Sequence, residues 1–398
     1  MRRAALGWCL CGCLAAGATA DDPEILAANI VNAADHSSGR VSPGEIVILY
    51  PAHAGPAALV GQHLDESGRI ATAGGETRVL FDGIPAPLAY TISGEIAAVA
   101  PYEVAGRTAV EVVVEYRGRR SAPVTLPLVE STPALFTLDG SGMGQAAMLN
   151  DTGCCNSALN PAAAGSVVAL YATGEGQTAP AGITGNVSSY PKPADYPAPR
   201  LPVAVTVGGK KAQIVFAGEA PHTVTGLLQV NFRIPDDVEP GDAVPLVLTV
   251  GDAHSIEGVT MAVRSAVQRV VVADADPAAR AWLQRLLRGA GYQVVDALAH
   301  QAADLAIIGL SLPERQRTAL LRDLQALRPR MKIAVIAPSA GAESLRAADL
   351  MGAQAVFTRP LASAVVLGRV KELLRPHPVP YVTEDIPLTQ RLLSGAAH

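Results

Sequence analysis

The chain has 398 residues, which is too long for one ordinary domain and indicates two or three. Its formal net charge of −5 is mild, and the basic runs RGRR (117–120) and RPRMK (328–332) are short, so we expect no nucleic-acid partner. The 37 glycines and 30 prolines indicate many turns rather than a disordered chain.

Residues 1–20 have the pattern of a signal peptide. Arg2 and Arg3 form a basic start, residues 4–17 are an apolar stretch, and Ala18-Thr19-Ala20 supplies the small residues that signal peptidase requires. The apolar stretch is too short for a comfortable membrane span, so we expect cleavage after Ala20 rather than an anchor. LCGC (10–13) is a poor match to a lipoprotein box because of Cys11.

The mature chain is therefore expected to be soluble, without a membrane span, and exported to the periplasm, the cell surface or the medium. It would be cytoplasmic only if the signal assignment were wrong.

From about residue 27 to 264 the chain alternates apolar runs of period two with Gly- and Pro-rich turns, which is typical of antiparallel β-sandwiches. The runs are EIVILY (45–50), TRVLFDG (77–83), AVEVVVEY (109–116), SVVALYA (166–172), LPVAVTVGG (201–209), LLQVNFRIP (227–235) and AVPLVLTVG (243–251).

This region also repeats itself. SPGEIVILY (42–50) aligns with AAGSVVALY (163–171), and GEIAAVAPYEV (94–104) aligns with LLQVNFRIPDDV (227–238). The offset grows along the chain because the second copy carries an insertion, residues 182–200. A duplicated strand order predicts two tandem immunoglobulin-like sandwiches, residues 21–135 and 136–265.

Several motifs in this region carry a family resemblance. They are VNAA (31–34), SPGEIV (42–47), GIPAPLAY (83–90), APYEV (100–104), NPAAAGSVVALYATGEG (160–176), FAGEAP (216–221), LQVNFRIP (228–235) and GDAVPLVLTVG (241–251). Together they resemble the uncharacterised paired Ig-like C-terminal domain of secreted acidobacterial proteins. The resemblance implies export and a β-sandwich but no reaction. LYPAHAG (49–55) departs from the family pattern, which has a Gly-containing strand end there.

Candidate chemistry in residues 21–265 is sparse. DGSGMGQ (139–145) precedes another strand, so it predicts a hairpin turn rather than a phosphate-binding helix start. The histidines are scattered, and no G-x-S-x-G elbow occurs. We therefore expect no enzyme, no metal site and no cofactor.

Cys154 and Cys155 are the two cysteines outside the signal segment, and they are adjacent. They could close a vicinal disulfide in an oxidising compartment, stay as two thiols, or act as a redox switch. A structural staple in a turn is the preferred interpretation.

From residue 266 the pattern changes to continuous apolar strands alternating with helices, which predicts a doubly wound parallel sheet over residues 266–375. Strands are expected in 267–277, at 293–295, 304–309, 332–337 and 355–360, and helices at 278–288, 314–328, 343–352 and 363–375. Residues 376–398 form a C-terminal tail.

The motifs VQRVVVADADP (267–277), DLAIIGLSLP (304–313) and GAQAVFTRP (352–360) resemble a response-regulator receiver (CheY-like) domain. The resemblance implies acids that hold Mg²⁺, an aspartate that accepts a phosphoryl group, and a Thr or Ser and a Lys that bind the phosphoryl oxygens.

Most of that chemistry is missing here. Asp274 and Asp276 keep an acidic cluster, but Ala275 replaces the main metal-binding acid and Gly309 replaces the acceptor. Ala337 stands in place of the Thr or Ser, and Arg359 replaces the Lys. Asp304, at the other end of its strand, is too far away to substitute for the acceptor. The segment 296–303 is also shorter than a receiver's second helix requires.

We therefore expect a degenerate receiver-like domain in which an Asp274–Arg359 ion pair remains and aspartyl phosphorylation is lost. The favoured function is a non-enzymatic, exported modular binding or scaffold protein with an unidentified protein or envelope partner. The alternative is a response-regulator-type protein of a phosphorelay system that binds its partner without phosphorylation. A hydrolase or other enzyme lacks any supporting constellation.

Overall fold

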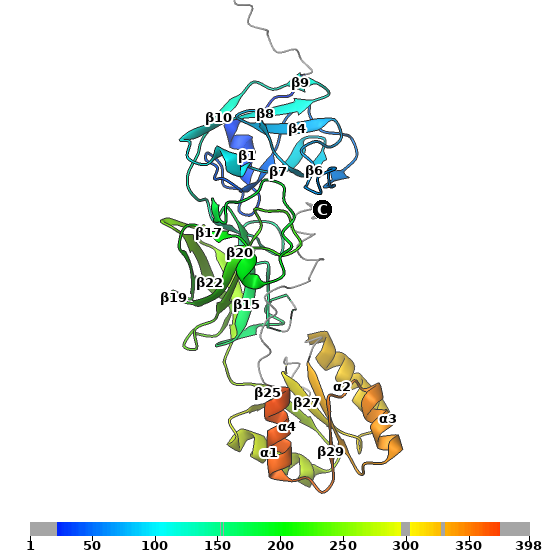
Figure 1. Cartoon of the computed structure of the whole chain (residues 1–398). Coiled ribbons are helices and arrows are strands. Elements are labelled where there is room, and N and C mark those ends of the chain that lie inside the picture. The colour runs from blue at the N-terminus through cyan, green and yellow to red at the C-terminus, as the bar shows by residue number, and fades with distance from the viewer. Residues whose placement is uncertain (1–21, 152, 154, 296–302, 328–330, 375–398) are drawn as a thin grey trace, which may run out of the picture.

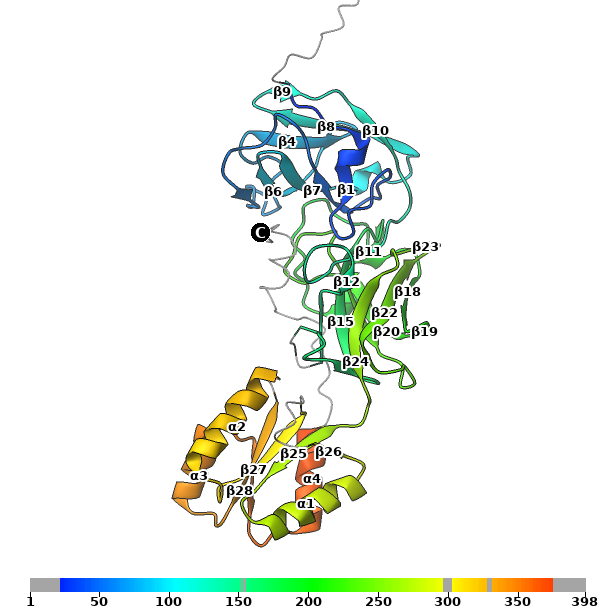
Figure 2. The ribbon, with the colours of Figure 1, turned by 180° about the vertical axis from the view of Figure 1, so that it is seen from behind.

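The computed structural model describes residues 22–151, 153, 155–295, 303–327 and 331–374. Two regions made of β-sheets are followed by an α/β region, and we call them the first β-module, the second β-module and the α/β-module (Figures 1 and 2). No helix among the described residues is long and apolar enough to cross a membrane. Residues 1–20 and 376–398, which the sequence assigns to a signal peptide and a tail, lie outside the described residues.

The first β-module consists of two antiparallel sheets. One sheet has the order β1 (Ile30–Asn32), β2 (Ile46–Leu49), β7 (Glu95–Val99), β6 (Leu88–Ile92), β3 (Val60–Gly61). The other has the order β10 (Val124–Pro127), β8 (Ala109–Tyr116), β4 (Thr77–Phe81), β5 (Ile84–Pro85), with β9 (Arg119–Arg120) beside β8. Two 3-10 turns, η1 (Ala27–Asn29) and η2 (Tyr102–Val104), complete the module.

The second β-module also has two sheets. One has the order β11 (Ala134–Leu135), β15 (Val167–Thr173), β21 (Leu228–Arg233), β20 (Gln213–Glu219), with β13 (Met148–Leu149) beside β15. The other has the order β12 (Gly144–Gln145), β24 (Val259–Arg264), β22 (Gly241–Val250), β18 (Val203–Val207), β19 (Lys210–Lys211), with β14 (Ala162–Ala163) and β23 (Ala253–His254) beside it. The insertion adds the hairpin of β16 (Thr178–Ala179) and β17 (Ala198–Pro199) and the 3-10 turn η3 (Pro193–Asp195).

The two β-modules share a strand order, as a duplication predicts. The order β1-β2-β7-β6 of the first module corresponds to β11-β15-β21-β20 of the second, and β10-β8-β4-β5 corresponds to β24-β22-β18-β19. Even a local irregularity repeats, because β6 and β20 both carry a bulge against their partner strand. The immunoglobulin-like assignment of this architecture stays a prediction.

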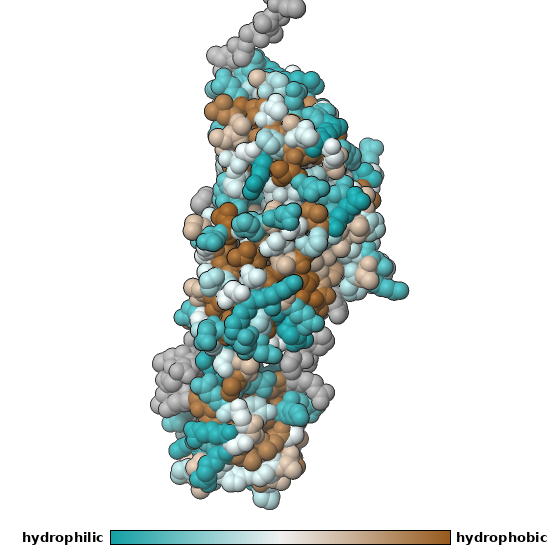
Figure 3. Space-filling view, turned by 90° about the vertical axis from the view of Figure 1, so that its left-hand side faces the viewer, coloured by the Kyte–Doolittle hydropathy of each residue, from teal (hydrophilic) through white to brown (hydrophobic). Residues whose placement is uncertain are grey.

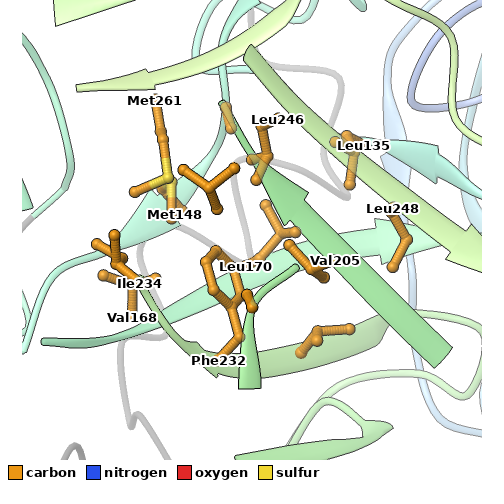
Figure 4. Packing of buried hydrophobic residues seen from close by; sticks show 14 of the residues in the cluster. Leu135, Met148, Val168, Leu170, Val205, Phe232, Ile234, Leu246, Leu248 and Met261 are labelled. Carbon is orange, nitrogen blue, oxygen red and sulfur yellow. The ribbon is translucent and has the colours of Figure 1, made fainter. Parts of the chain in front are cut away.

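Alternating side chains of the two sheets in each β-module fill a core between them. In the second module this core contains Phe232, Leu170, Met148, Met261 and Leu246, all fully buried (Figure 4). Burying a side chain of this size contributes roughly 1.5–3 kcal/mol, so this core is a main contribution to holding the two sheets together. DGSGMGQ (139–145) forms the predicted turn and runs into β12.

The two β-modules pack directly against each other. One apolar cluster combines Ile46 and Val99 of the first module with Phe136, Tyr171 and Leu227 of the second. Glycines allow the backbones to approach, since a Cβ on Gly226 would lie 2.2 Å from the carbonyl oxygen of Gly44. The chain leaves the first module after β10, and β11 already pairs with β15, so the change of module falls just before the predicted boundary at residue 135.

The α/β-module has one parallel sheet with the order β26 (Gln293–Val295), β25 (Arg269–Ala273), β27 (Leu305–Gly309), β28 (Lys332–Ala337), β29 (Ala355–Thr358). The helices are α1 (Pro277–Gly289), α2 (Glu314–Leu327), α3 (Ala342–Leu350) and α4 (Ser363–Leu373). The predicted doubly wound sheet is therefore present, with its strands in the flavodoxin-like order.

Helices cover both faces of this sheet (Figures 1 and 2). Leu283 and Leu287 of α1 and Val366 of α4 pack on one face, and Leu321 and Leu324 of α2 pack on the other. Because both faces are buried, the strands read as continuous apolar runs. The predicted shortening of the segment 296–303 falls mostly on residues outside those described.

A buried ion pair connects the second β-module to the α/β-module. Arg264 ends β24, and its Nη2 lies 2.5 Å from Oδ1 of Asp304, which precedes β27. The other carboxylate oxygen of Asp304 accepts a hydrogen bond from the backbone N–H of Arg269 at 2.7 Å. Both carboxylate oxygens of Asp304 are thus occupied by these contacts. Asp304 lies at the opposite end of β27 from Gly309.

Candidate functional site

The residues that the sequence assigned to a receiver pocket meet at one edge of the parallel sheet. Asp274 follows β25, Gly309 ends β27, Ala337 ends β28 and Arg359 follows β29. Carboxyl ends of parallel strands lie along the same edge, which is where such sheets form their sites. We call this group, together with Asp276, the pocket cluster.

Asp274 is the centre of the pocket cluster, and its side chain is fully buried. Its Oδ2 lies 3.0 Å from Nη2 of Arg359, which is the predicted ion pair. Its Oδ1 accepts hydrogen bonds from Ser311 Oγ at 2.9 Å and from the backbone N–H of Asp276 at 2.9 Å. A buried carboxylate is stable only when it is paired and hydrogen-bonded, and Asp274 meets both conditions.

Asp276 has two roles in the cluster. Its Oδ1 accepts hydrogen bonds from the backbone N–H groups of Ala278 and Ala279, so it is the N-cap of α1. Its Oδ2 lies 3.3 Å from Nη1 of Arg359. The two backbone hydrogen bonds and the nearby guanidinium lower the pKa of Asp276.

Gly309 has no room for the aspartate found at this position in a receiver. A Cβ on Gly309 would lie 2.3 Å from Oδ2 of Asp274 and 3.0 Å from Oγ of Ser311. The space next to the strand end is therefore filled by the carboxylate of Asp274. Ala337 is fully buried and brings no hydroxyl, while Ser339 is exposed in the loop that follows.

These residues do not fit the Mg²⁺ that the receiver resemblance implies. The Asp274 carboxylate is already bound by Arg359 and Ser311, Ala275 brings no ligand oxygen, and Asp276 caps a helix. Among the residues that the structure describes, no group of three or more His, Cys, Asp and Glu could hold a metal ion.

Two members of the network were missed by the sequence analysis. Ser311 donates to Asp274, and Nη1 of Arg280 donates to the backbone oxygen of Asp274 at 2.6 Å. Ser311 lies two residues after the end of β27, and Arg280 lies in the first turn of α1. The signal available in the sequence was that both are close along the chain to residues assigned to the pocket.

The predicted vicinal disulfide cannot be placed, because Cys154 lies outside the described residues. Cys155 is exposed, and its backbone forms an isolated bridge with Leu149. The pair therefore stays a prediction.

A second cluster of acids was not predicted. Glu45, Glu175 and Glu219 are buried where the two β-modules meet. We call these three residues the junction glutamates.

Comparison with known proteins finds partial similarity. No family model matches the chain. The sensory/regulatory protein RpfC of Xanthomonas campestris pv. campestris is 30% identical over 118 residues, which is 26% of this chain and 16% of RpfC, and RpfC of a second strain matches equally. The chain thus spans about a sixth of the length of these curated relatives.

Among solved structures, a CheY-like receiver domain protein from Methanospirillum hungatei is 28% identical, with 27% of this chain and 94% of that chain covered and a TM-score of 0.25. The chemotaxis protein CheY4 of Vibrio cholerae is 17% identical, with 27% and 99% covered and the same TM-score. The chain therefore has weak local similarity to response-regulator receiver domains over about a quarter of its length.

Proposed function

We propose that this chain is a non-enzymatic, exported binding or scaffold protein whose α/β-module contacts a partner without accepting a phosphoryl group. The observation that supports it is the filled pocket cluster: Arg359 and Ser311 bind Asp274, and Gly309 offers no nucleophile. A protein that needs neither phosphate nor metal there can keep its receiver-like fold as a rigid surface for recognition.

The β-modules fit the same function. They are packed together through a shared apolar cluster, so they present their loops in a fixed arrangement. On the face shown in Figure 3, hydrophobic side chains gather over the middle of the molecule between hydrophilic ones. We propose that these modules are the two immunoglobulin-like domains that the sequence resembles and that they bind a protein or envelope component.

Export is proposed from the signal-peptide pattern of residues 1–20. With that single segment at the start, all three modules would lie on the same side of the membrane. The phosphorelay enzymes that use ATP would then be unable to reach the α/β-module.

The second candidate is a response-regulator-type protein that binds a signalling partner independently of phosphorylation. The local similarity to RpfC, a sensory/regulatory protein, favours it. It requires the α/β-module to be in the cytoplasm, so location separates the two candidates.

The first test is phosphorylation. The full chain is incubated with acetyl phosphate and Mg²⁺ beside an active receiver, and intact mass is measured. We expect no added phosphoryl group on this chain, and none on its Gly309→Asp variant, because the new carboxylate would collide with that of Asp274. A phosphorylated wild-type chain would refute the proposal.

The second test is the location of the C-terminus. A tag fused after His398 is tested for protease accessibility in intact cells and in spheroplasts. An accessible tag supports the exported binding protein. A tag that is protected even in spheroplasts supports the phosphorelay candidate instead.

A further inference from the structure

Three carboxyl groups are buried between the two β-modules. Glu45 directly precedes β2 in the first module, Glu175 follows β15 in the second, and Glu219 ends β20 in the second. Each is 1% exposed. Full burial of an acid requires a compensating cation, a full set of hydrogen-bond donors, or a proton on the acid itself.

Glu45 has donors. Its Oε1 accepts from Nδ2 of Asn32 at 2.9 Å, and its Oε2 accepts from the backbone N–H of Ser42 at 2.7 Å and from Oγ1 of Thr132 at 2.5 Å. Thr132 belongs to the segment that enters the second module, so Glu45 links the two modules by hydrogen bonds.

Glu175 and Glu219 lack such a set. Oε1 of Glu175 accepts from the hydroxyl of Tyr102 at 3.4 Å, and Oε2 of Glu219 is hydrogen-bonded to Ser188. The second oxygen of each carboxyl group is buried without a hydrogen-bond partner. Leaving a charged oxygen in that state is far more costly than leaving a neutral acid.

No cation compensates for these acids within the part of the chain that the structure describes. None of the three glutamates forms an ion pair with a described Lys, Arg or His. The charged groups that raise their pKa are also acids: Asp35 from the β1–β2 loop acts on Glu45, and Glu219 and Glu45 act on Glu175. The glutamates in turn raise the pKa of Tyr102 in η2 and of Tyr190 in the insertion. Glu103, the charged neighbour of Tyr102, is exposed and accepts from Oγ1 of Thr184.

Burial raises the pKa values of all three junction glutamates. Desolvation raises the pKa of Glu45 and of Glu219 from 4.5 to about 7, and it raises the pKa of Glu175 well above its usual range, with Glu219 adding to the effect. The junction therefore closes most easily when protons occupy these acids.

Tyr102 connects this chemistry to the contact between modules. Its ring comes from the first module and is buried against the second, between Gly44 and Gly182, where a Cβ would lie 2.4 and 2.6 Å from ring atoms. Its backbone N–H donates to Oγ1 of Thr184 at 2.9 Å, across the junction. Ionisation of Glu175 would thus place a negative charge beside the side chain of Tyr102, which packs the first module against the second.

We propose that the contact between the two β-modules is pH-sensitive: it is closed while Glu175 and Glu219 carry protons, and it opens when they ionise. Rising pH opens the contact, and the opening separates Tyr102 from Gly182 and Thr184 of the second module without unfolding the core of either module.

Hydrogen exchange of the full chain, followed by mass spectrometry from pH 5.5 to 8.5 and corrected for intrinsic exchange, tests this proposal. The reporters are the amides of Tyr102 and Ile46, whose partners, Thr184 and Thr173, lie in the other module. We expect their protection to fall at least tenfold across this range, while β22 and β24 stay protected. Loss of protection in all segments together would refute the proposal, because the junction would not open on its own.

The matched variant is Glu175→Gln with Glu219→Gln, which keeps the size of both side chains and removes the charge. Protection of Tyr102 and Ile46 should then lose most of its pH dependence, and what remains reports Glu45. The control is Glu239→Gln, an exposed glutamate between β21 and β22, which should behave as the wild type. An unchanged pH dependence in the double variant would overturn the proposal. If that variant does not fold, Tyr102→Phe removes the hydroxyl that favours ionised Glu175, so the opening should move to higher pH, and an unmoved opening would equally refute it.

Discussion

The pocket cluster and the junction glutamates are two ways to bury acids in one chain. The carboxyl group of Asp274 is paired with Arg359 and accepts hydrogen bonds from Ser311 and the N–H of Asp276. Among the described residues, no cation pairs with Glu175 or Glu219, and one carboxyl oxygen of each has no hydrogen-bond partner there. The first arrangement depends on a cation, whereas the second depends on protons. The two regions should therefore respond oppositely to pH.

The largest expected effect is the pH dependence of the β-modules. The folded state binds more protons than the unfolded state wherever the pKa of a glutamate is raised, so stability falls as pH rises from about 4.5. Between this pH and about 7, each titrating glutamate lowers the free energy of unfolding by roughly 1.4 kcal/mol per pH unit. Urea unfolding followed by tyrosine fluorescence measures this.

The pocket cluster should give the α/β-module the opposite pH dependence of stability. The pKa of Asp276 is lowered, so its contribution is present above its unfolded value of 3.8 and is lost as pH falls through the lower folded value. Trp282 of α1 is the one tryptophan outside residues 1–20 and reports on this module. A tryptophan-detected transition that weakens as pH rises from 5 to 8, in parallel with the β-modules, would contradict the contrast.

The second prediction removes the cation from the pocket cluster. Arg359→Met leaves the buried carboxyl group of Asp274 without its cationic partner, which should destabilise the α/β-module by about 3 kcal/mol. Arg359→Lys should recover part of the loss, because an ammonium can replace the charge but not the two-pronged contact with Asp274 and Asp276. Urea unfolding detected through Trp282 gives both values.

Arg322→Ala is the matched control, since Arg322 is exposed in α2 and pairs with the neighbouring exposed Asp323. It should change stability by less than about 1 kcal/mol. Equal losses in the two variants would mean that Arg359 acts as an ordinary surface residue.

The third prediction concerns the space beside Asp274. Gly309→Ala should destabilise the α/β-module by roughly 1–3 kcal/mol, because its Cβ would meet the Asp274 carboxylate. Gly289→Ala is a suitable control at the end of α1, where nothing lies within 4 Å of the added Cβ. If Gly309→Ala is neutral, the pocket has more room than the contacts of Asp274 imply.

Much of the fold could be predicted from the sequence, because its signals are local. Buried strands such as 304–309 and 332–337 are continuous apolar runs, and Asp276-Pro277 starts a helix by capping chemistry. The repeat was visible because both copies preserve the order of the strands and their turn glycines. The Asp274–Arg359 pair was predicted through alignment with the receiver pattern.

The junction glutamates could not be predicted, because their contacts join distant segments. Glu45 meets Thr132 and Tyr102 meets Glu175 across 87 and 73 residues, and no periodicity marks such a pair. An isolated glutamate beside a Gly turn, as in SPGEIV, is normally exposed. Glu45 is buried where one module packs against the other.

The smallest predicted effect separates the two roles of Asp276. Asp276→Ala removes both the cap of α1 and the charge near Arg359, and it should lower the Tm of the α/β-module by a few degrees. Asp276→Asn keeps a capping oxygen and removes the charge, so it should recover most of this loss if capping is the main role. Arg359 still has Asp274 in that variant, and a half-exposed pair contributes little. If Asn and Ala lower the Tm equally in scans monitored through Trp282, the charge beside Arg359, rather than the cap, is what Asp276 supplies to the pocket cluster.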